Sequence, residues 1–381
     1  MAAVTGALAR TGPLSSAKRL VVKIGSALLV DQGSGHLRRT WLDAMADDVA
    51  AARARGQDVV LVSSGAVAVG RRRLGLGSGP LRLEEKQAAA AAGQIQLAHA
   101  YQETLARHGI TVAQVLLTLD DSEDRKRYLN ARYTLETLLR LGAVPVINEN
   151  DTVATEEIRF GDNDRLAARV AEMIVADALV LLSDIDGLYS ANPQTHPDAT
   201  FIPVVSELTP DIEAMAGASL SGVGSGGMVT KLLAARICMG AGCRMAIAPG
   251  RPMNPLGTLE RGGRCTWFLP VAEPHAARKR WIAGTLTAAG TVVVDDGAVA
   301  ALHDGRSLLP AGVVDVEGDF QRGDAVVVRD RSGRIVGRGL TAYSARDALR
   351  IMGHRTADIE TLLGFHGRDE IIHRDDLALE P

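Results

Sequence analysis

The chain has 381 residues and a mass of 40.2 kDa, which is more than one compact domain usually needs, so we expect two domains. Its apolar fraction of 46% and charged fraction of 23% are typical of a globular protein and exclude a disordered or collagen-like chain. The net charge of −3 gives no overall attraction to nucleic acid.

The N-terminal segment and the cysteines indicate the compartment. Arg10 and Pro13 interrupt the continuous apolar core that a signal peptide needs, and we expect residues 1–17 to form a flexible tail. No stretch reaches the roughly 18 uncharged apolar residues of a membrane helix, so no membrane partner is expected. Three cysteines are too few for a disulfide framework and indicate a reducing compartment, which predicts a cytoplasmic protein.

Apolar runs alternate with helical patterns between residues 18 and 270. Near-continuous Val, Ile and Leu runs predict strands buried on both faces of a parallel sheet, at residues 19–25, 58–64, 112–119, 144–148, 178–183 and 244–248. Helical patterns separate them, at residues 41–55, 84–107, 122–141, 164–176 and 228–240. The alternation predicts an α/β fold, a three-layer αβα sandwich around a mainly parallel sheet.

After Pro270 and Pro274 the regular alternation of predicted strands and helices ends. We therefore place a domain boundary near residues 270–276, between domains of residues 18–270 and 275–381. Strand-like runs end in turn signals at residues 291–294, 298–302 and 325–329, which predicts hairpins in a small β-rich domain. From Pro274 onward there are 14 basic and 16 acidic residues, a balance that argues against nucleic acid as a partner.

Lysine is scarce, with six lysines among the 42 Lys and Arg residues, so a lysine in a glycine-rich setting is a functional candidate. Lys23 ends an apolar strand directly before Gly25. Its ammonium group must emerge at the carboxyl end of the strand, where Gly25 allows an anion to approach the backbone. A lysine that merely reaches solvent from the edge of the sheet explains the pattern equally well.

Lys231 follows a run of glycine and serine, residues 222–227, at the predicted start of a helix. A cation in the first helical turn opposes the helix dipole unless an anion is bound there too, which predicts a phosphate between the helix N-terminus and Lys231. The G-x-G-x-x-G match in this run follows no strand, and the chain contains no G-x-x-x-x-G-K-[ST]. Neither a dinucleotide-binding fold nor a P-loop is therefore predicted.

Polar clusters follow three of the predicted strands. Residues 63–66, with Ser64 and Gly65, offer donors for a phosphate or carboxylate, but an ordinary N-cap serine is the favoured explanation of this segment taken alone. Residues 148–151 follow a buried strand and residues 161–164 open a helix, and together they suit the ammonium and carboxylate groups of an amino-acid-like ligand. Residues 183–187 suit a nucleotide ribose or base, or form an Asx turn.

Taken in chain order, six segments resemble the amino-acid kinase family: VVKIGS, VSSGAVAVG, INENDTVATEE, GDNDRLAARVA, LLSDIDGLY and GSGGMVTKLLAA. The resemblance covers about residues 18–269, and NENDTVA with GDND is its most specific part. It is greatest to the members of the family that phosphorylate glutamate. The C-terminal region resembles a PUA domain, an appendage that such bacterial enzymes often carry.

The resemblance implies a role for each matching residue. Lys23, Lys231 and Asp164 would be catalytic, the lysines contacting the ATP phosphates from opposite sides and Asp164 orienting both. L-glutamate would be bound by Ser64, Asn148, Asp151 and Asn163. The nucleotide would be held by Lys23, Ser183, Asp184, Ser225, Gly226, Gly227, Met228, Val229, Thr230 and Lys231. The family often has threonine where Ser183 and Ser225 stand, and both changes keep the hydroxyl group. No protein side chain is assigned to a metal.

The implied reaction is the ATP-dependent phosphorylation of the γ-carboxylate of L-glutamate to L-glutamyl 5-phosphate, with Mg²⁺ as cofactor, the first step of proline biosynthesis. A carboxylate is already ionised at pH 7, so the acceptor needs no general base. The resemblance further implies feedback inhibition by proline around residues 130–163 and a homodimer or homotetramer. Because the product is labile, direct transfer to glutamyl-phosphate reductase is a further expectation.

Three alternatives stay open. An aspartate or acetylglutamate kinase is the nearest, and NENDTVA with the PUA-like region argues against it. An RNA-binding PUA protein is disfavoured by the acidic balance of the C-terminal region, although a local basic stripe at residues 329–338 could bind RNA. A catalytically silent regulatory subunit is disfavoured by the intact lysines and acids.

Overall fold

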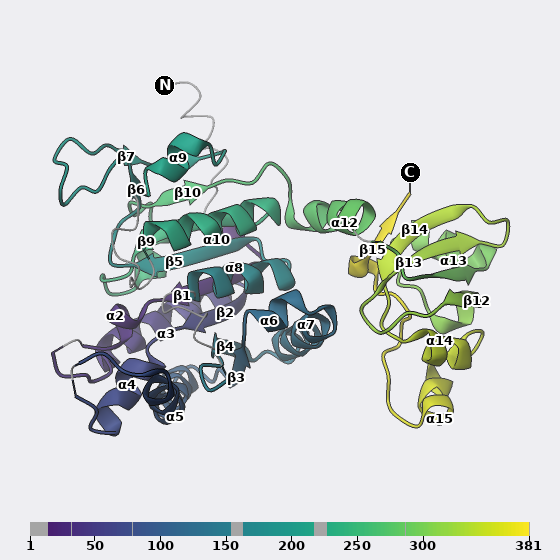
Figure 1. Ribbon diagram of the computed structural model, residues 1–381, viewed down its shortest axis with the longest axis horizontal. Coiled ribbons are helices and arrows are strands. Elements are labelled where there is room, and N and C mark those ends of the chain that lie inside the picture. The colour runs from purple at the N-terminus through teal and green to yellow at the C-terminus, as the bar shows by residue number, and fades with distance from the viewer. Residues whose placement is uncertain are drawn as a thin grey trace. The chain divides into compact units, whose positions relative to one another are not determined.

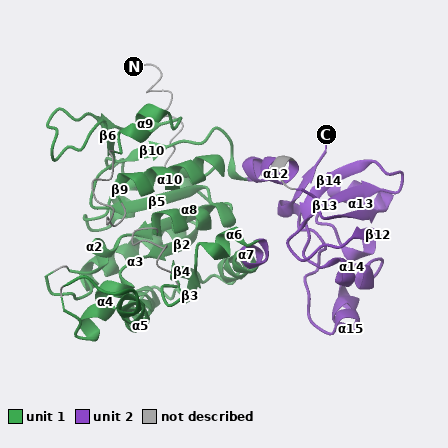
Figure 2. Ribbon diagram, in the orientation of Figure 1, with its two compact units in different colours: residues 1–124, 130–274 green, residues 125–129, 275–381 purple. Residues whose placement is uncertain are grey.

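The computed structural model describes residues 14–31, 33–77, 79–153, 163–216, 227–285 and 287–380. The chain divides into two compact units, shown in Figure 2. Unit 1 comprises residues 1–124 and 130–274, and unit 2 comprises residues 125–129 and 275–381. Within the described ranges, no helix is both long and apolar enough to cross a bilayer.

Unit 1 is built on an eight-stranded sheet with the strand order β3-β4-β2-β1-β5-β9-β10-β8. All neighbouring strands pair in parallel except β9 and β10, which are antiparallel. A separate pair, β6 and β7, is antiparallel. The strands are β1 (Arg19–Ile24), β2 (Asp58–Ser63), β3 (Val112–Leu117), β4 (Val144–Glu149), β5 (Ala178–Ser183), β6 (Leu188–Tyr189), β7 (Phe201–Ile202), β8 (Val204–Val205), β9 (Arg244–Pro249) and β10 (Thr266–Phe268).

Helices cover both faces of this sheet, with α8 and α10 on one side and α3 on the other (Figure 1), so the predicted three-layer α/β class is confirmed. The helices of this part are η1 (Leu14–Ser16), α2 (Ser26–Leu29), α3 (Arg39–Ala54), α4 (Ala66–Arg73), α5 (Leu83–Ala106), α6 (Asp120–Glu123), α7 (Arg125–Arg140), α8 (Asn163–Met173), α9 (Pro210–Ala214), α10 (Met228–Gly240) and α11 (Pro255–Glu260). The first five residues of α7 belong to unit 2.

The central strand β1 shows how the sequence divides between the two faces. Leu20, Val22 and Ile24 belong to the core cluster that β1 forms with α3. Successive side chains of a strand point to opposite faces, so Val21 and Lys23 face the α8 side. Val21 is fully buried there, which explains why the strand reads as a continuous apolar run.

The short helix α4 was not among the expected elements, and glycines explain how it fits. Gly65 adopts a left-handed φ of +104° as the N-cap of α4. At the contact between α4 and α5, a Cβ on Gly70 would lie 1.7 Å from the carbonyl oxygen of Ala89, and a Cβ on Gly93 would lie 1.9 Å from that of Ala66. Only glycine permits this backbone approach, so α5 packs directly against the segment that follows β2.

Unit 2 is built on a five-stranded sheet with the order β12-β11-β13-β14-β15, in which only β11 and β13 pair in parallel. The predicted β-rich class of this region is confirmed. Its elements are α12 (Pro274–Thr285), β11 (Gly290–Val294), α13 (Asp296–His303), η2 (Pro310–Gly312), β12 (Val313–Gly318), β13 (Ala325–Asp330), β14 (Ile335–Leu340), α14 (Ala345–Ile351), η3 (Thr356–Asp358), α15 (Ile359–Leu363), η4 (Arg374–Asp376) and β15 (Leu377–Leu379).

One expectation in this region is wrong. Residues 298–302 were expected to form a strand after a turn at residues 295–297, but they lie in helix α13. The side chain of Asp295 accepts a hydrogen bond from the backbone N–H of Ala298 at 2.7 Å, so the apparent turn signal is an N-cap. The hairpin expected after residues 325–329 is present, formed by β13 and β14.

Candidate active site

Two lysine side chains meet one carboxylate in the interior of unit 1. The Nζ of Lys23 lies 2.6 Å from the Oδ1 of Asp164, and the Nζ of Lys231 lies 3.0 Å from its Oδ2. Asp164 is fully buried, and only 9% of Lys23 and 6% of Lys231 is exposed. The structure therefore brings the two scarce lysines singled out in the sequence to a single point.

Burial and the two neighbouring lysines shift the pKa of Asp164 in opposite directions. Burial by itself raises the pKa of this carboxyl, but the nearby charges and hydrogen bonds of Lys23 and Lys231 outweigh it, and the net pKa lies below the usual value. Asp164 is therefore ionised at neutral pH. The hydroxyl of Thr230 also donates to its Oδ2 at 3.2 Å.

The three groups come from the ends of three elements. Lys23 lies at the carboxyl end of the central strand β1, Asp164 in the first turn of α8, and Lys231 in the first turn of α10. Asp164 complements the positive end of the α8 dipole, whereas Lys231 stands at the positive end of α10. Within the described residues no side chain caps α10 at its N-cap residue, Gly227, and a helix N-terminus of this kind suits an anion.

The amide of Asn163 joins the residues expected to bind the amino acid. The two hydrogens of its Nδ2 are shared among three acceptors, the carbonyl oxygen of Ser63 at 3.1 Å, the Oγ of Ser64 at 2.8 Å and the Oδ1 of Asn148 at 3.1 Å. These contacts link the ends of β2 and β4, which are neighbours in the sheet, to the start of α8. Since Asp164 follows Asn163 directly, the amide cluster lies beside the lysine pair.

Asp151 lies in a loop after β4 and lines a cavity of about 210 Å³ together with Gln94, Glu149, Asn150 and residues of α5 and β3. Burial raises the pKa of Asp151 to about 6, and no cation within the described residues lowers it. A carboxylate in this state gains most from a ligand that brings a positive charge. No hydrogen bond among the described residues joins Asp151 to Asn163.

The residues expected at the nucleotide divide into two groups. Ser183 ends β5, beside β1, and its hydroxyl donates to the carboxylate of Asp184 at 3.0 Å; no contact in the described structure ties this pair to the lysines. Gly227, Met228, Val229 and Thr230 open α10 next to Lys231. Ser225 and Gly226 lie outside the described residues.

Residues 18–249 match the amino acid kinase family model, which is more than half of the chain, and residues 290–363 match the PUA domain model. The chain belongs to the amino acid kinase family. Both parts of the resemblance noted in the sequence are confirmed by these matches.

Relatives of this amino acid kinase cover nearly all of it. Glutamate 5-kinase from Paramagnetospirillum magneticum (strain AMB-1) is 69% identical over 368 residues, 97% of this chain and 99% of the relative. Glutamate 5-kinase from Rhodospirillum rubrum is 66% identical, over 94% of this chain and 96% of the relative. Glutamate 5-kinase from Paracoccus denitrificans is 60% identical over both full lengths.

Gln94 and Tyr101 contact the candidate site and its flanking strand but were not predicted. The Oε1 of Gln94 accepts a hydrogen bond from the Nδ2 of Asn148 at 2.8 Å, and the hydroxyls of Tyr101 and Ser63 lie 3.0 Å apart. The available signal was position: Gln94 falls on the apolar stripe of α5 that also contains Leu97 and Tyr101, where a polar residue needs a partner.

The donor set bears on Mg²⁺ binding. Both carboxylate oxygens of Asp164 are engaged by lysine ammonium groups, and the described residues contain no cluster of three His, Cys, Asp or Glu side chains that could hold a metal. From the described residues alone, a Mg²⁺ ion at this point would therefore need phosphate oxygens of ATP and water as its ligands.

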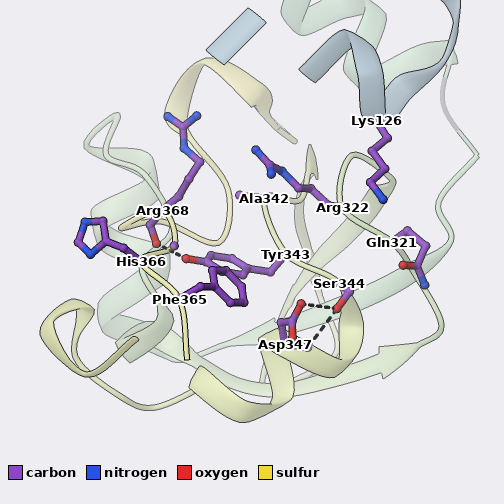
Figure 3. Close-up of a pocket in the computed structure, with 11 residues that line it drawn as sticks. Lys126, Gln321, Arg322, Ala342, Tyr343, Ser344, Asp347, Phe365, His366 and Arg368 are labelled. Carbon is purple, nitrogen blue, oxygen red and sulfur yellow. Dashed lines mark hydrogen bonds between the residues drawn. The ribbon is translucent and has the colours of Figure 1, made fainter. Parts of the chain in front are cut away.

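A larger cavity, of about 510 Å³, lies within unit 2 (Figure 3). Its wall includes Arg322, Tyr343 and Arg368, and the hydroxyl of Tyr343 donates to the carbonyl oxygen of Arg368. None of the residues predicted for the kinase site lines it. In the stripe at residues 329–338, Arg329 pairs with Glu317 at 3.9 Å and Arg334 with Asp330 at 3.0 Å, so acidic neighbours offset part of its charge.

Proposed function

We propose that this amino acid kinase transfers the γ-phosphoryl group of ATP to the γ-carboxylate of L-glutamate. The observation that carries the proposal is the pair of ammonium groups on Asp164, which lies next in sequence to the amide of Asn163. The three relatives named glutamate 5-kinase support the choice of acceptor.

In the reaction, an oxygen of the γ-carboxylate forms a bond to the γ-phosphorus while the bond from that phosphorus to the β–γ bridging oxygen breaks. The products are L-glutamyl 5-phosphate and ADP. The acceptor is ionised at neutral pH, so no side chain has to remove a proton. The rate then depends on alignment and on the stabilisation of charge at the phosphoryl oxygens.

Lys23 and Lys231 provide that stabilisation in this proposal. Their ammonium groups come from different elements and converge on Asp164, so they approach the migrating group from two sides. Asp164 holds both in position and keeps two cations close together before ATP binds. Fixed charges in a site that excludes water need no reorganisation during the reaction.

The start of α10 supplies the rest of the phosphate site. Gly227, Met228, Val229 and Thr230 present backbone N–H groups at a helix N-terminus, with Ser225 and Gly226 before them in the sequence. Ser183 and Asp184, at the end of the neighbouring strand β5, would contact the nucleoside. Bound Mg²⁺ would neutralise charge on the phosphate oxygens.

The amino acid would occupy the edge of the sheet formed by β2 and β4. Ser64, Asn148 and Asn163 offer neutral hydrogen-bonding groups, and Asp151 offers a carboxylate for the substrate ammonium group. In this arrangement the γ-carboxylate lies toward Asp164 and the lysines.

Further parts of the proposal concern the whole protein. Residues 18–270 would form the kinase domain and residues 275–381 the PUA domain. The tail expected at residues 1–17 is too long at its end, since residues 14–16 form η1 and Leu14 and Ala17 are buried in the core of unit 1. Proline would compete with glutamate for the same site, the enzyme would be a cytoplasmic homodimer or homotetramer, and glutamyl-phosphate reductase would take up the labile product. Light scattering tests the oligomeric state, and inhibition kinetics with proline test its competition with glutamate.

The full chain tests the reaction directly. Purified protein is incubated with Mg²⁺ and ATP and with glutamate, aspartate or N-acetylglutamate, and ADP release is followed while hydroxylamine traps acyl phosphate as hydroxamate. We expect hydroxamate and ADP in equal amounts with glutamate and at least tenfold less with either alternative. Turnover with aspartate or N-acetylglutamate that equals turnover with glutamate would contradict the proposal.

A further inference from the structure

The hydrogen bonds of the site determine how three side-chain amides are oriented. The starting point is the backbone carbonyl of Ser63, which can only accept a hydrogen bond. The group of Asn163 that lies 3.1 Å from it must therefore be the NH₂ group. The same NH₂ group faces Asn148, so the atom of Asn148 on that side must be its carbonyl oxygen.

The orientation of Asn148 in turn determines that of Gln94. With its oxygen toward Asn163, Asn148 directs its NH₂ group at Gln94 across 2.8 Å, and Gln94 must present its own oxygen there. The NH₂ group of Gln94 consequently points away from Asn148. It is buried and has no acceptor within the described residues, and Gln94 as a whole is 8% exposed.

Gln94 also lines the cavity that Asp151 lines, and neighbouring small residues make room there. Ala90 and Ala91 form part of the wall, and Gly93 lets α5 approach the backbone of α4 closely enough to bring Gln94 to the end of β4. A buried NH₂ group without an acceptor is unfavourable, and such groups in native proteins call for an explanation. A ligand that carries an acceptor into the cavity provides one.

We infer that Gln94 is a substrate-recognition residue whose NH₂ group donates to an oxygen of the α-carboxylate of the amino-acid substrate. The inference rests on the proposed function and adds to it. In an α-amino acid the carboxylate and the ammonium group share one carbon atom, so their partners must lie together. Gln94 as donor and Asp151 as anion, in the wall of one cavity, meet that requirement.

The chain of hydrogen-bonded side-chain amides formed by Gln94, Asn148 and Asn163 gives the site a direction. It runs from Gln94 through Asn148 and Asn163 to the residue next to Asp164, so a substrate held at its α end by Gln94 extends toward the lysines. N-acetylglutamate keeps both carboxylates but lacks the ammonium group, which leaves Asp151 unpaired beside a bound carboxylate. A site that is built to pair a charged group discriminates strongly against an analogue that lacks it.

Two variants separate donation to the substrate from support of Asn148. Gln94→Glu keeps an oxygen for Asn148 but replaces the donor by a negative charge, and we expect the KM for glutamate to rise at least 30-fold while the KM for ATP changes less than twofold. Gln94→Met removes the acceptor for Asn148 as well, so kcat is expected to fall in addition.

The matched control is Gln57→Glu. Gln57 is also a buried glutamine, but it lies before β2 at the opposite edge of the sheet, where its Nε2 donates to the carbonyl oxygens of Leu14 and Ala17. This variant is expected to lower the melting temperature and to leave the KM for glutamate unchanged.

The pH profile provides a readout that a purely structural role would not move. Protonation of the introduced carboxylate in the Gln94→Glu variant restores a donor, so the ratio of its KM for glutamate to that of the parent enzyme should fall as the pH is lowered from 8 to 6. The ratio is used because the ionisation of Asp151 changes the KM of both proteins over this range, and Asp151 and Glu149 line the same cavity as residue 94.

The outcomes are distinct. A parent enzyme that does not phosphorylate glutamate overturns the proposed function itself. A parent enzyme that does so, with a Gln94→Glu variant whose KM for glutamate stays within threefold, overturns only the role of Gln94. Equal losses for glutamate and ATP, with no change of the ratio with pH, would assign Gln94 a structural role and likewise overturn the inference.

Discussion

The Nζ of Lys23 lies 2.6 Å from the Oδ1 of Asp164, although the two residues are far apart in the chain. This contact joins the end of the central strand to the start of α8. Lys231 engages the other oxygen of the same carboxylate, so the charge at this point consists of two cations and one anion. A phosphoryl group brings the negative charge that would balance them.

Removal of one cation should slow turnover far more than it weakens folding. For Lys231→Ala we expect kcat to fall at least a hundredfold, because a fixed positive charge near the transferring group stabilises the transition state by about 3 kcal/mol. Steady-state kinetics with saturating glutamate and ATP measures the effect. Lys18→Ala, at an exposed lysine before β1, should keep parental kcat, and near-normal turnover by folded Lys231→Ala would remove Lys231 from the catalytic residues.

Loss of the carboxylate should affect stability as well. Asp164→Asn removes the anion that two buried ammonium groups share, and breaking a buried ion pair in this way costs about 3–5 kcal/mol in the free energy of unfolding. Asp58→Asn is the control, since Asp58 pairs with Arg19 and Arg53 near the surface, where such pairs contribute about 1 kcal/mol or less. Urea denaturation compares them, and equal losses would contradict a buried, charge-sharing role for Asp164.

Binding of glutamate should weaken in mild acid. The pKa of Asp151 is about 6 because burial disfavours its charge, so the carboxyl is mostly ionised at pH 7 and mostly neutral at pH 5. A neutral carboxyl cannot pair with the substrate ammonium group, and kcat/KM for glutamate at saturating ATP should therefore fall about tenfold per pH unit below pH 6. Over this range the γ-carboxyl of glutamate stays ionised.

The variant that checks this assignment is Asp151→Asn. It should have a raised KM for glutamate at pH 7 and a kcat/KM that varies little between pH 7 and pH 5. A profile that still falls in the variant would place the titrating group elsewhere.

Close packing of α4 and α5 should be sensitive to a single methyl group. Gly93→Ala places a Cβ 1.9 Å from the carbonyl oxygen of Ala66, so the helices must separate, at a cost of about 1–3 kcal/mol or more in the free energy of unfolding. Because α5 carries Gln94, the KM for glutamate should rise too. Gly240→Ala meets no atom within 4 Å and should be neutral or slightly stabilising. A Gly93→Ala variant as stable as Gly240→Ala would disprove the close contact.

Local sequence patterns were sufficient to predict most of the central strands of unit 1. Buried parallel strands are continuous apolar runs, and β1, β2, β3, β4, β5 and β9 all occur where such runs predicted strands. The pattern failed at residues 298–302, because an Asp that caps a helix and an Asp that opens a turn look alike in sequence. It also missed α4, whose start depends on the left-handed conformation of Gly65.

The sequence by itself determined the fold class, the family and the candidate lysines, acids and amides, because strand periodicity, glycine-rich runs and short motifs are local properties of the chain. Only the tertiary structure decided that Lys23 and Lys231 share Asp164, and that Gln94 ends a chain of amides beginning at Ser63. The contact between Gln94 and Asn148 spans 54 positions of the chain and that between Ser63 and Asn163 spans 100, and their geometry depends on how helices pack across the sheet. No local pattern carries that information.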